Sequence, residues 1–163
     1  MTENWSYYSM ESPFGTVVIH DDGTAITRVQ WDREDLVKKG EENLTPIIEK
    51  MIKQLEEYFE GSRQEFDISI RFRGTDFQKR VWRVLRKIPY GETRTYQEIA
   101  ELIENPKGCR AVGMANNKNQ LNIVVPCHRV LSGTGKPIGY NGGIDVKKQL
   151  IRHELKNLDV TLG

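Results

Sequence analysis

The chain has 163 residues, a formal net charge of +1 and two cysteines, so it can bury the core of one domain or of a compact pair of domains. Two cysteines are too few for a secreted disulfide scaffold, and no apolar run is long enough to cross a membrane. The opening MTENWSYYSM lacks the pattern of a secretory signal peptide, so we expect a cytoplasmic protein with reduced thiols.

The first half predicts a small mixed α/β domain. Two β-rich runs flank Asp22 and Gly23 within residues 16–31, which is a good hairpin signal. Apolar residues recur at helical spacing over residues 44–59. Residues 66–72 then alternate between apolar and polar side chains, which predicts a half-buried strand. No pattern in this half indicates chemistry.

The second half begins with a predicted helix. Thr75 and Gln78 have the spacing of a capping box, and an apolar stripe continues from there to Ile88, before a Pro-Tyr-Gly turn at residues 89–91.

Two shorter helices are predicted next. Thr95 and Glu98 repeat the capping box and begin a helix that should run to residues 105–106. Another helix should begin near Arg110. Two short helices around a tight turn are typical of a helix-turn-helix, although many helical domains contain such pairs.

The last predicted helix follows a loop over residues 131–143 with five glycines in thirteen residues. Helical spacing resumes over residues 144–158, and at about 100° per residue Glu154 falls inside the apolar arc. Lys147 lies in the same arc, so an exposed edge is one interpretation. The other is a buried carboxylate, which needs a partner and is a candidate site residue.

Charge also differs between the two halves. Residues 1–74 carry 9 Lys and Arg against 15 Asp and Glu, whereas residues 75–163 carry 15 against 8. Scattered surface charge can produce this difference, but a basic half is also typical of a protein that binds a polyanion such as nucleic acid.

The segment VPCHRV places Cys127 between Pro126 and His128. A zinc site would need four Cys or His ligands at short paired spacings, which the chain lacks, and a reducing compartment disfavours a disulfide with Cys109. An inert buried thiol is the plain alternative. The neighbouring histidine could instead activate a nucleophile, and with Glu154 as a third group the arrangement would also suit a thiol hydrolase.

Five segments together resemble the O6-alkylguanine-DNA alkyltransferase family: TYQEIA, RAVG, NKNQLN, PCHRV and RHE, in the family's order within residues 75–158. The resemblance implies a ribonuclease-H-like α/β domain over residues 1–74 and a mostly helical domain over residues 75–163. The second domain would contain the helix-turn-helix and the catalytic site.

The function implied by this resemblance is DNA repair by direct damage reversal. A methyl or other alkyl group would pass from O6 of guanine in double-stranded DNA to Cys127, irreversibly and once per molecule. Whether O4 of thymine is also repaired stays open. The family resemblance implies no cofactor and no metal, and we expect a monomer without membrane contact.

The resemblance also implies roles for individual residues. His128 would take the thiol proton through a water, Glu154 would polarise His128, and Asn119 would hold this network. Tyr96 would donate a hydrogen bond to the guanine ring as negative charge leaves with it. The flipped base would be lined by Val130, Tyr140, Asn141 and Gly142.

Contact with DNA would come from the helix-turn-helix. The second helix would enter the minor groove, and Arg110 would fill the gap left by the extruded base. Small residues would permit the close fit, and Thr95 would also contact DNA. The small residues are Ala111, Gly113 and Ala115.

Two positions vary from the family pattern and leave the preferred alkyl size open. Asn122 stands where many members have a proline that walls the pocket, and Asn141 occupies a variable loop position. The alternative function is a non-enzymatic one, either a lesion-binding protein of the alkyltransferase-like type or a helix-turn-helix regulator. Alkyltransferase-like proteins replace the reactive cysteine, whereas this chain retains Cys127.

Overall fold

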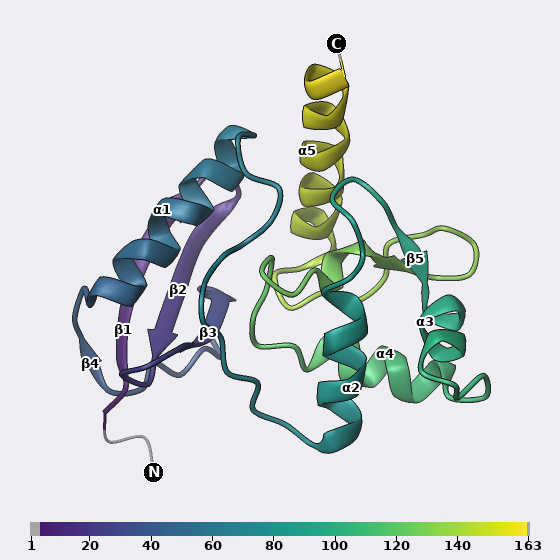
Figure 1. Cartoon of the computed structure of the whole chain (residues 1–163), viewed down its shortest axis with the longest axis horizontal. Helices are drawn as coiled ribbons and strands as arrows, with labels where there is room; N and C mark the ends of the chain where they lie inside the picture. Colours follow the sequence, from purple (N-terminus) through teal and green to yellow (C-terminus); the bar gives the residue numbers. More distant parts are fainter. Residues whose placement is uncertain (1–3, 163) are drawn as a thin grey trace. The chain divides into compact units, whose positions relative to one another are not determined.

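The computed structural model describes residues 4–162, and the chain divides into two compact units, Met1–Phe72 and Arg73–Gly163 (Figure 1). The first is a mixed α/β unit and the second is mostly helical, as the sequence predicts. The predicted boundary lay two residues later, after Gly74.

The first unit is built on a four-stranded sheet of order β3-β2-β1-β4. Its strands are β1 (Ser6–Ser12), β2 (Gly15–Asp21), β3 (Ile26–Trp31) and β4 (Glu41–Glu42). The first three are antiparallel neighbours, and β4 pairs with β1 in parallel. The predicted hairpin at Asp22 and Gly23 is confirmed: the Asp22 carboxylate accepts hydrogen bonds from the backbone of Thr24 and Ala25, and Gly23 has φ 98°.

Helix α1 (Pro46–Glu60) packs on this sheet, running along its strands, and confirms the helix predicted for residues 44–59 (Figure 1). Thr45 caps it by accepting from the Ile48 amide, and proline suits the first turn because its missing N–H would have no partner there. The buried face of α1 includes Ile48, Met51 and Leu55, at the spacing of an amphipathic helix.

The predicted strand over residues 66–72 is wrong. The apolar side chains alternate as expected, but only Ile70 forms a bridge, with Ile26. The side chain of Gln54 on α1 bonds both backbone groups of Asp67, donating to the carbonyl at 2.8 Å and accepting from the amide at 3.0 Å. At Asp67 the Gln54 side chain therefore bonds the backbone groups that a neighbouring strand would otherwise bond.

The second unit contains the predicted helices, α2 (Asp76–Leu85), α3 (Tyr96–Leu102), α4 (Cys109–Asn117) and α5 (Ile144–Leu162). Both capping boxes, at Thr75 and at Thr95, are present. Helix α2 ends three residues before Ile88, because its last turn tightens into backbone bonds from Lys87 to Val84 and from Ile88 to Leu85.

Helices α3 and α4 pack together and form the helix-turn-helix, and α4 also packs on α2 (Figure 1). The Trp82 indole of α2 donates a 2.8 Å hydrogen bond to the Ala115 carbonyl of α4. A short parallel pair, β5 (Arg94–Thr95) with β6 (Val130–Leu131), joins the start of α3 to the segment after the cysteine.

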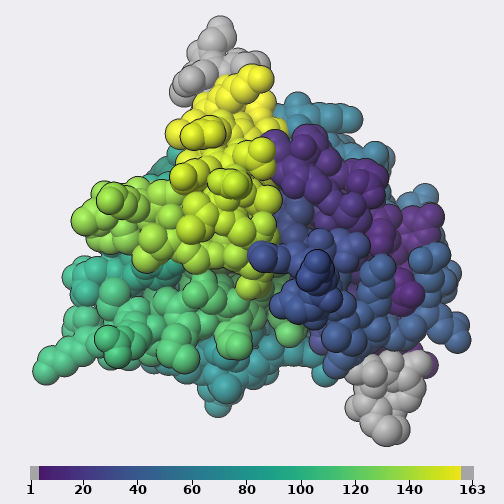
Figure 2. Space-filling view, turned by 180° about the vertical axis from the view of Figure 1, so that it is seen from behind, coloured from purple at the N-terminus to yellow at the C-terminus, as the bar shows by residue number. Residues whose placement is uncertain are grey.

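The glycine-rich loop lies beside the first turns of α5 on the surface of the second unit (Figure 2). Lys147 on α5 donates hydrogen bonds to two carbonyls of this loop. Within residues 4–162 no helix is both long and apolar enough to cross a membrane.

His20 is a fully buried imidazole on β2. Its Nε2 accepts a 2.9 Å hydrogen bond from the Lys39 amide, so the neutral ring is the form that fits. Burial, together with the charges of Arg28, Lys39 and Lys38, lowers the pKa of His20 to about 4.

This lowered pKa predicts acid sensitivity of the first unit. In the unfolded chain His20 binds a proton below its ordinary pKa of 6.5, whereas the folded chain resists protonation until about pH 4. Stability should therefore fall between pH 6.5 and pH 4, by about 2 kcal/mol from this residue alone. Denaturant unfolding at pH 7 and pH 4.5 measures the loss, which should be smaller in His20→Gln. An equal loss in both proteins would assign the acid sensitivity to other groups.

Candidate active site

Cys127 lies in a short 3-10 helix, Cys127–Arg129, directly after Pro126. The segment before it turns tightly, with backbone hydrogen bonds from Val125 to Leu121 and from Cys127 to Val125, both 2.8 Å. These bonds and the proline fix the backbone at the thiol.

Asn119 holds this turn from the side. Its amide donates to the Val125 carbonyl at 2.9 Å, and its side-chain oxygen accepts from the Leu121 amide at 2.9 Å. The structure thus shows that Asn119 shapes the turn that leads to Cys127, while its expected role in holding the network of His128 and Glu154 stays a prediction.

His128 and Glu154 form a buried pair, with Nε2 and Oε2 2.6 Å apart. An ionised carboxylate only accepts hydrogen bonds, so the proton between these two atoms belongs to Nε2. The other ring nitrogen, Nδ1, is buried and has no hydrogen-bond partner among the described residues. The ring therefore presents a basic lone pair at Nδ1.

Arg129 supplies the counter-charge that Glu154 needs. Its guanidinium donates to both carboxylate oxygens, at 2.8 and 3.0 Å, and to the Ile88 carbonyl at 2.7 Å. Burial alone would raise the pKa of Glu154, but the contacts with His128 and Arg129 lower it below its ordinary value. Arg129 thus anchors Glu154 to the segment after α2 through these three hydrogen bonds.

Both reacting groups rest in their neutral forms. Burial raises the pKa of the Cys127 thiol to about 11, against smaller opposing effects of Asn119 and Lys147. Burial also lowers the pKa of His128 below its ordinary value, even though Glu154 acts in the opposite direction. At neutral pH the site thus contains a protonated thiol and a neutral imidazole, and the thiol needs a base in order to react.

The thiol also has a polar neighbour that the sequence did not suggest. Cys127 Sγ lies 3.6 Å from Oδ1 of Asn122, at the distance of a weak sulfur hydrogen bond. Asn122 was expected only as a departure from the proline that walls the pocket in many relatives. The structure adds a direct contact with the thiol.

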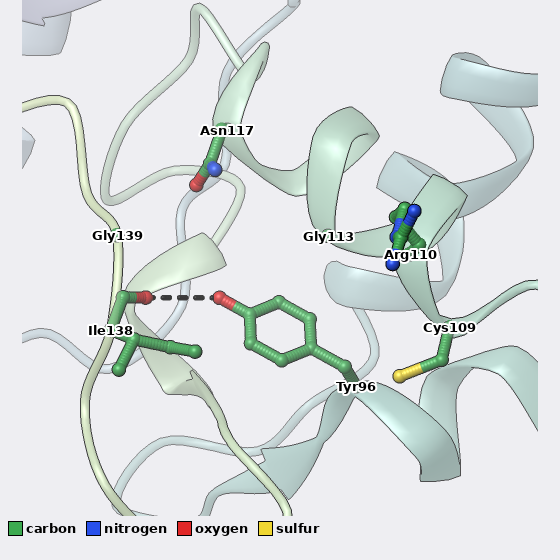
Figure 3. A pocket seen from close by; sticks show the side chains of 7 residues that line it. All are labelled: Tyr96, Cys109, Arg110, Gly113, Asn117, Ile138 and Gly139. Carbon is green, nitrogen blue, oxygen red and sulfur yellow. Dashed lines mark hydrogen bonds between the residues drawn. The ribbon is translucent and has the colours of Figure 1, made fainter.

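Tyr96 crosses a pocket of about 250 Å³ between the glycine-rich loop and the start of α4 (Figure 3). Its hydroxyl donates a 3.1 Å hydrogen bond to the Ile138 carbonyl. Burial raises the pKa of Tyr96 to about 12, so the hydroxyl stays protonated and remains a donor. The pocket is lined by Tyr96, Cys109, Arg110, Gly113, Asn117, Ile138 and Gly139.

The residues expected around the base come from the loop and from β6. Tyr140 is buried with its ring 6.5 Å from that of His128, and Asn141 donates a 2.9 Å hydrogen bond to the Asn119 carbonyl. Val130 is buried in β6, opposite Arg94. Gly142, the remaining predicted residue, lies partly exposed in the turn before α5.

The structure exposes some of the residues that were expected to contact DNA and buries another. Arg110 and Ala111 are exposed on α4, and Gly113 lines the pocket. Ala115 is only 3% exposed because it faces α2, so it does not lie on the outer face of α4. The side chain of Thr95 caps α3 by accepting from the Glu98 amide.

Lys147 is the site residue that sequence reasoning left undecided. It is fully buried, and its ammonium donates to the Ile138 carbonyl at 3.0 Å and to the Gly139 carbonyl at 3.2 Å. Burial lowers its pKa to about 8, while the negative charge of Cys127 would raise it. In the sequence, its position in the apolar arc was the signal for burial. The loop carbonyls that accept its hydrogen bonds could not be identified from the sequence.

Metal chemistry has no ligand set in the described part of the chain. Among the described side chains, those of residues 4–158, no three from His, Cys, Asp or Glu converge as a metal site. The fold and the site together define a helix-turn-helix protein that holds a protonated thiol and a neutral imidazole in its interior.

The comparisons with known proteins define the family. A model described as the 6-O-methylguanine DNA methyltransferase DNA-binding domain matches residues 76–156, and one described as the ribonuclease-like domain of the same proteins matches residues 5–72. The chain belongs to the 6-O-methylguanine DNA methyltransferase family.

Individual relatives agree over nearly the whole chain. A methylated-DNA–protein-cysteine methyltransferase of Methanosarcina acetivorans is 43% identical over 153 residues, which cover 91% of this chain and 97% of the relative. One from Mycobacterium tuberculosis is 42% identical over 151 residues, or 91% of each. The solved structure of M. tuberculosis OGT in complex with DNA superposes with a TM-score of 0.87 at 40% identity, over 93% of this chain and 94% of that one.

The contacts of Lys147 predict that it holds the glycine-rich loop in place. Lys147→Met removes two charge-assisted hydrogen bonds, so amide hydrogen exchange in residues 137–143 should accelerate about tenfold or more. Lys148→Met is the matched control, because Lys148 is the exposed neighbour on the same helix. Exchange that is unchanged in Lys147→Met, or equally faster in both variants, would contradict the holding role.

Proposed function

We propose that this protein repairs alkylated DNA by transferring the alkyl group from O6 of guanine to Cys127, once per molecule. The observation that supports it most is the buried series of Cys127, His128, Glu154 and Arg129 in a helix-turn-helix unit. The methyltransferases that the chain matches over nine-tenths of its length make the assignment.

The reaction starts with a proton transfer. Because Nε2 of His128 is bonded to the Glu154 carboxylate, Nδ1 is the atom that accepts the Cys127 proton, through a water. The sulfur then attacks the alkyl carbon, the S–C bond forms and the C–O6 bond breaks. The electron pair of that bond leaves with guanine.

Negative charge on the departing guanine needs a donor. The Tyr96 hydroxyl supplies one, since its pKa of about 12 keeps it protonated. In the described structure this hydroxyl is bonded to the Ile138 carbonyl, so it changes partner when the base enters. The imidazolium formed at His128 is stabilised by Glu154, whose charge Arg129 otherwise balances in this interior.

A buried thiol cannot reach O6 inside a stacked duplex, so the base is flipped out. Arg110 fills the gap. It is exposed at the start of α4 and lines the pocket that Tyr96 crosses (Figure 3). The basic second half supplies phosphate affinity that does not depend on sequence.

The product is a thioether, which the described site has no group to cleave. Repair therefore consumes the protein, and the thiol must be kept reduced until then. The cytoplasmic location favoured by the sequence fits this need and stays part of the proposal, as do the monomeric state and the division of labour between residues 1–74 and 75–163. A non-enzymatic role is disfavoured because Cys127 and its base are both retained.

Single-use transfer is tested by intact mass. Incubation with an excess of duplex containing O6-methylguanine should add one methylene unit per protein molecule, and peptide mapping should place it on Cys127. Cys127→Ser should add nothing, whereas Cys109→Ser should behave as the wild type. Repair that continues beyond the molar amount of protein, or alkylation at Cys109, would refute the proposal.

Arg110 is tested by comparing duplex repair with the reaction of free O6-benzylguanine. Flipping costs a few kcal/mol, so Arg110→Ala should slow duplex repair by on the order of a hundredfold. The free base needs no flipping, and its rate should stay near that of the wild type. Lys118→Ala, which removes an exposed cation at the end of the same helix, should weaken DNA binding only modestly. Equal loss on both substrates in Arg110→Ala would assign Arg110 a structural role.

A further inference from the structure

Helix α4 presents a bulky apolar side chain where its outer face was expected to be small. Met114 is 63% exposed, whereas Ala115, the next residue, is 3% exposed. At about 100° per residue, Met114 points only about 40° away from Arg110, one turn further along the helix. Around the helix axis, the exposed arc runs from Asn117 to Ala111 and includes Arg110 and Lys118. Met114 lies at the middle of this arc.

The charge around Met114 fits a polyanion. Lys107, Arg110 and Lys118 are exposed at the two ends of α4, and the sequence of α4 contains no acidic residue. A single exposed methionine is unremarkable by itself. One that is surrounded by cations on the second helix of a helix-turn-helix lies where a nucleic acid would be bound.

Gly113 leaves space on the pocket side of α4. A Cβ at this position would meet only the Tyr96 ring, at 3.9 and 4.0 Å, which is ordinary contact. Alanine would therefore fit inside the protein and would favour the helix by about 1 kcal/mol. Internal packing thus does not require the glycine, and its place in the lining of the pocket leaves room there for a bound group.

We propose that Met114 is a second wedge, which enters the minor groove of duplex DNA beside Arg110 and props the groove open while the base is out. The inference rests on the proposed function and adds a residue to it. A side chain in a helix covers the turn before its own Cα, so Met114 covers the surface next to Arg110. Methionine is among the apolar residues that proteins insert between base steps from the minor groove.

The wedge has an energetic signature that differs from that of a phosphate contact. Burying the Met114 side chain against sugars and base edges removes apolar surface from water, so Met114→Ala should bind duplex DNA about tenfold more weakly. No charge is lost, so the dependence of affinity on salt should be unchanged. In Lys118→Ala that dependence should decrease by about one counterion.

The experiment measures duplex affinity at several salt concentrations for the wild type, Met114→Ala, Met114→Leu and Leu155→Ala. Leu155 is the matched control, an apolar side chain on α5 that is 49% exposed. The wedge predicts a loss in Met114→Ala, rescue in Met114→Leu and no loss in Leu155→Ala. Because Met114 is exposed, the thermal midpoint of unfolding should not change.

Unstacking is read from 2-aminopurine placed next to the lesion, which should fluoresce less with Met114→Ala than with the wild type. The reaction with free O6-benzylguanine should be equal in both. Affinity that is unchanged or higher in Met114→Ala, or an equal loss in Leu155→Ala, would overturn the wedge. A wild type that binds duplex DNA but accepts no alkyl group would instead refute the proposed function, and the affinity series would still test Met114.

Discussion

The arrangement of the second unit depends on one buried carboxylate. Glu154 accepts hydrogen bonds from Arg129, His128 and the Gly91 amide. An unpaired charge in this interior would cost several kcal/mol, so each of these groups must stay in place for the unit to fold. The same bonds connect α5, the 3-10 helix at the thiol and the turn after α2. Stability of the fold and orientation of the imidazole thus have a common origin.

The same network explains how a buried thiol can be unreactive at rest and still be able to react with a substrate. With a pKa of about 11, Cys127 is protonated at neutral pH and resists adventitious alkylation and oxidation. The neutral imidazole of the next residue, His128, is oriented by Glu154. Under the proposed function, this imidazole takes the thiol proton when a substrate carbon is held against the sulfur.

Three sides of helix α4 have different roles. Its inner side packs on α2 through Ala115, its flank at Gly113 lines the pocket, and its outer side carries Arg110 and Met114. The turns of one short helix thereby connect the core, the pocket that Tyr96 crosses and the exposed face that we propose contacts DNA. Ala115 is small where α4 packs on α2, whereas Gly113 is small where a side chain would project toward the Tyr96 ring.

The sequence alone determined what depends on neighbours within a few residues. The capping boxes at Thr75 and Thr95, the hairpin at Asp22, the place of Glu154 in an apolar arc and the family motifs around Cys127 are all of this kind. Tertiary structure decided the rest. Residues 66–72 form a single bridge rather than a strand: Ser69 and Arg71 bond the backbone of Ile26, whereas Gln54, on a helix earlier in the chain, takes the backbone groups of Asp67.

The buried site shows the same division. The position of Lys147 in the apolar arc was visible in the sequence, but its burial depends on the carbonyls of Ile138 and Gly139, which the loop before α5 brings to it only when it folds back on the helix. Likewise, only the packing of α4 on α2 turns Ala115 inward and leaves Met114 outside. Local patterns fix which groups a segment offers, whereas the partners that satisfy a buried polar group come from elsewhere in the chain and become known only when it folds.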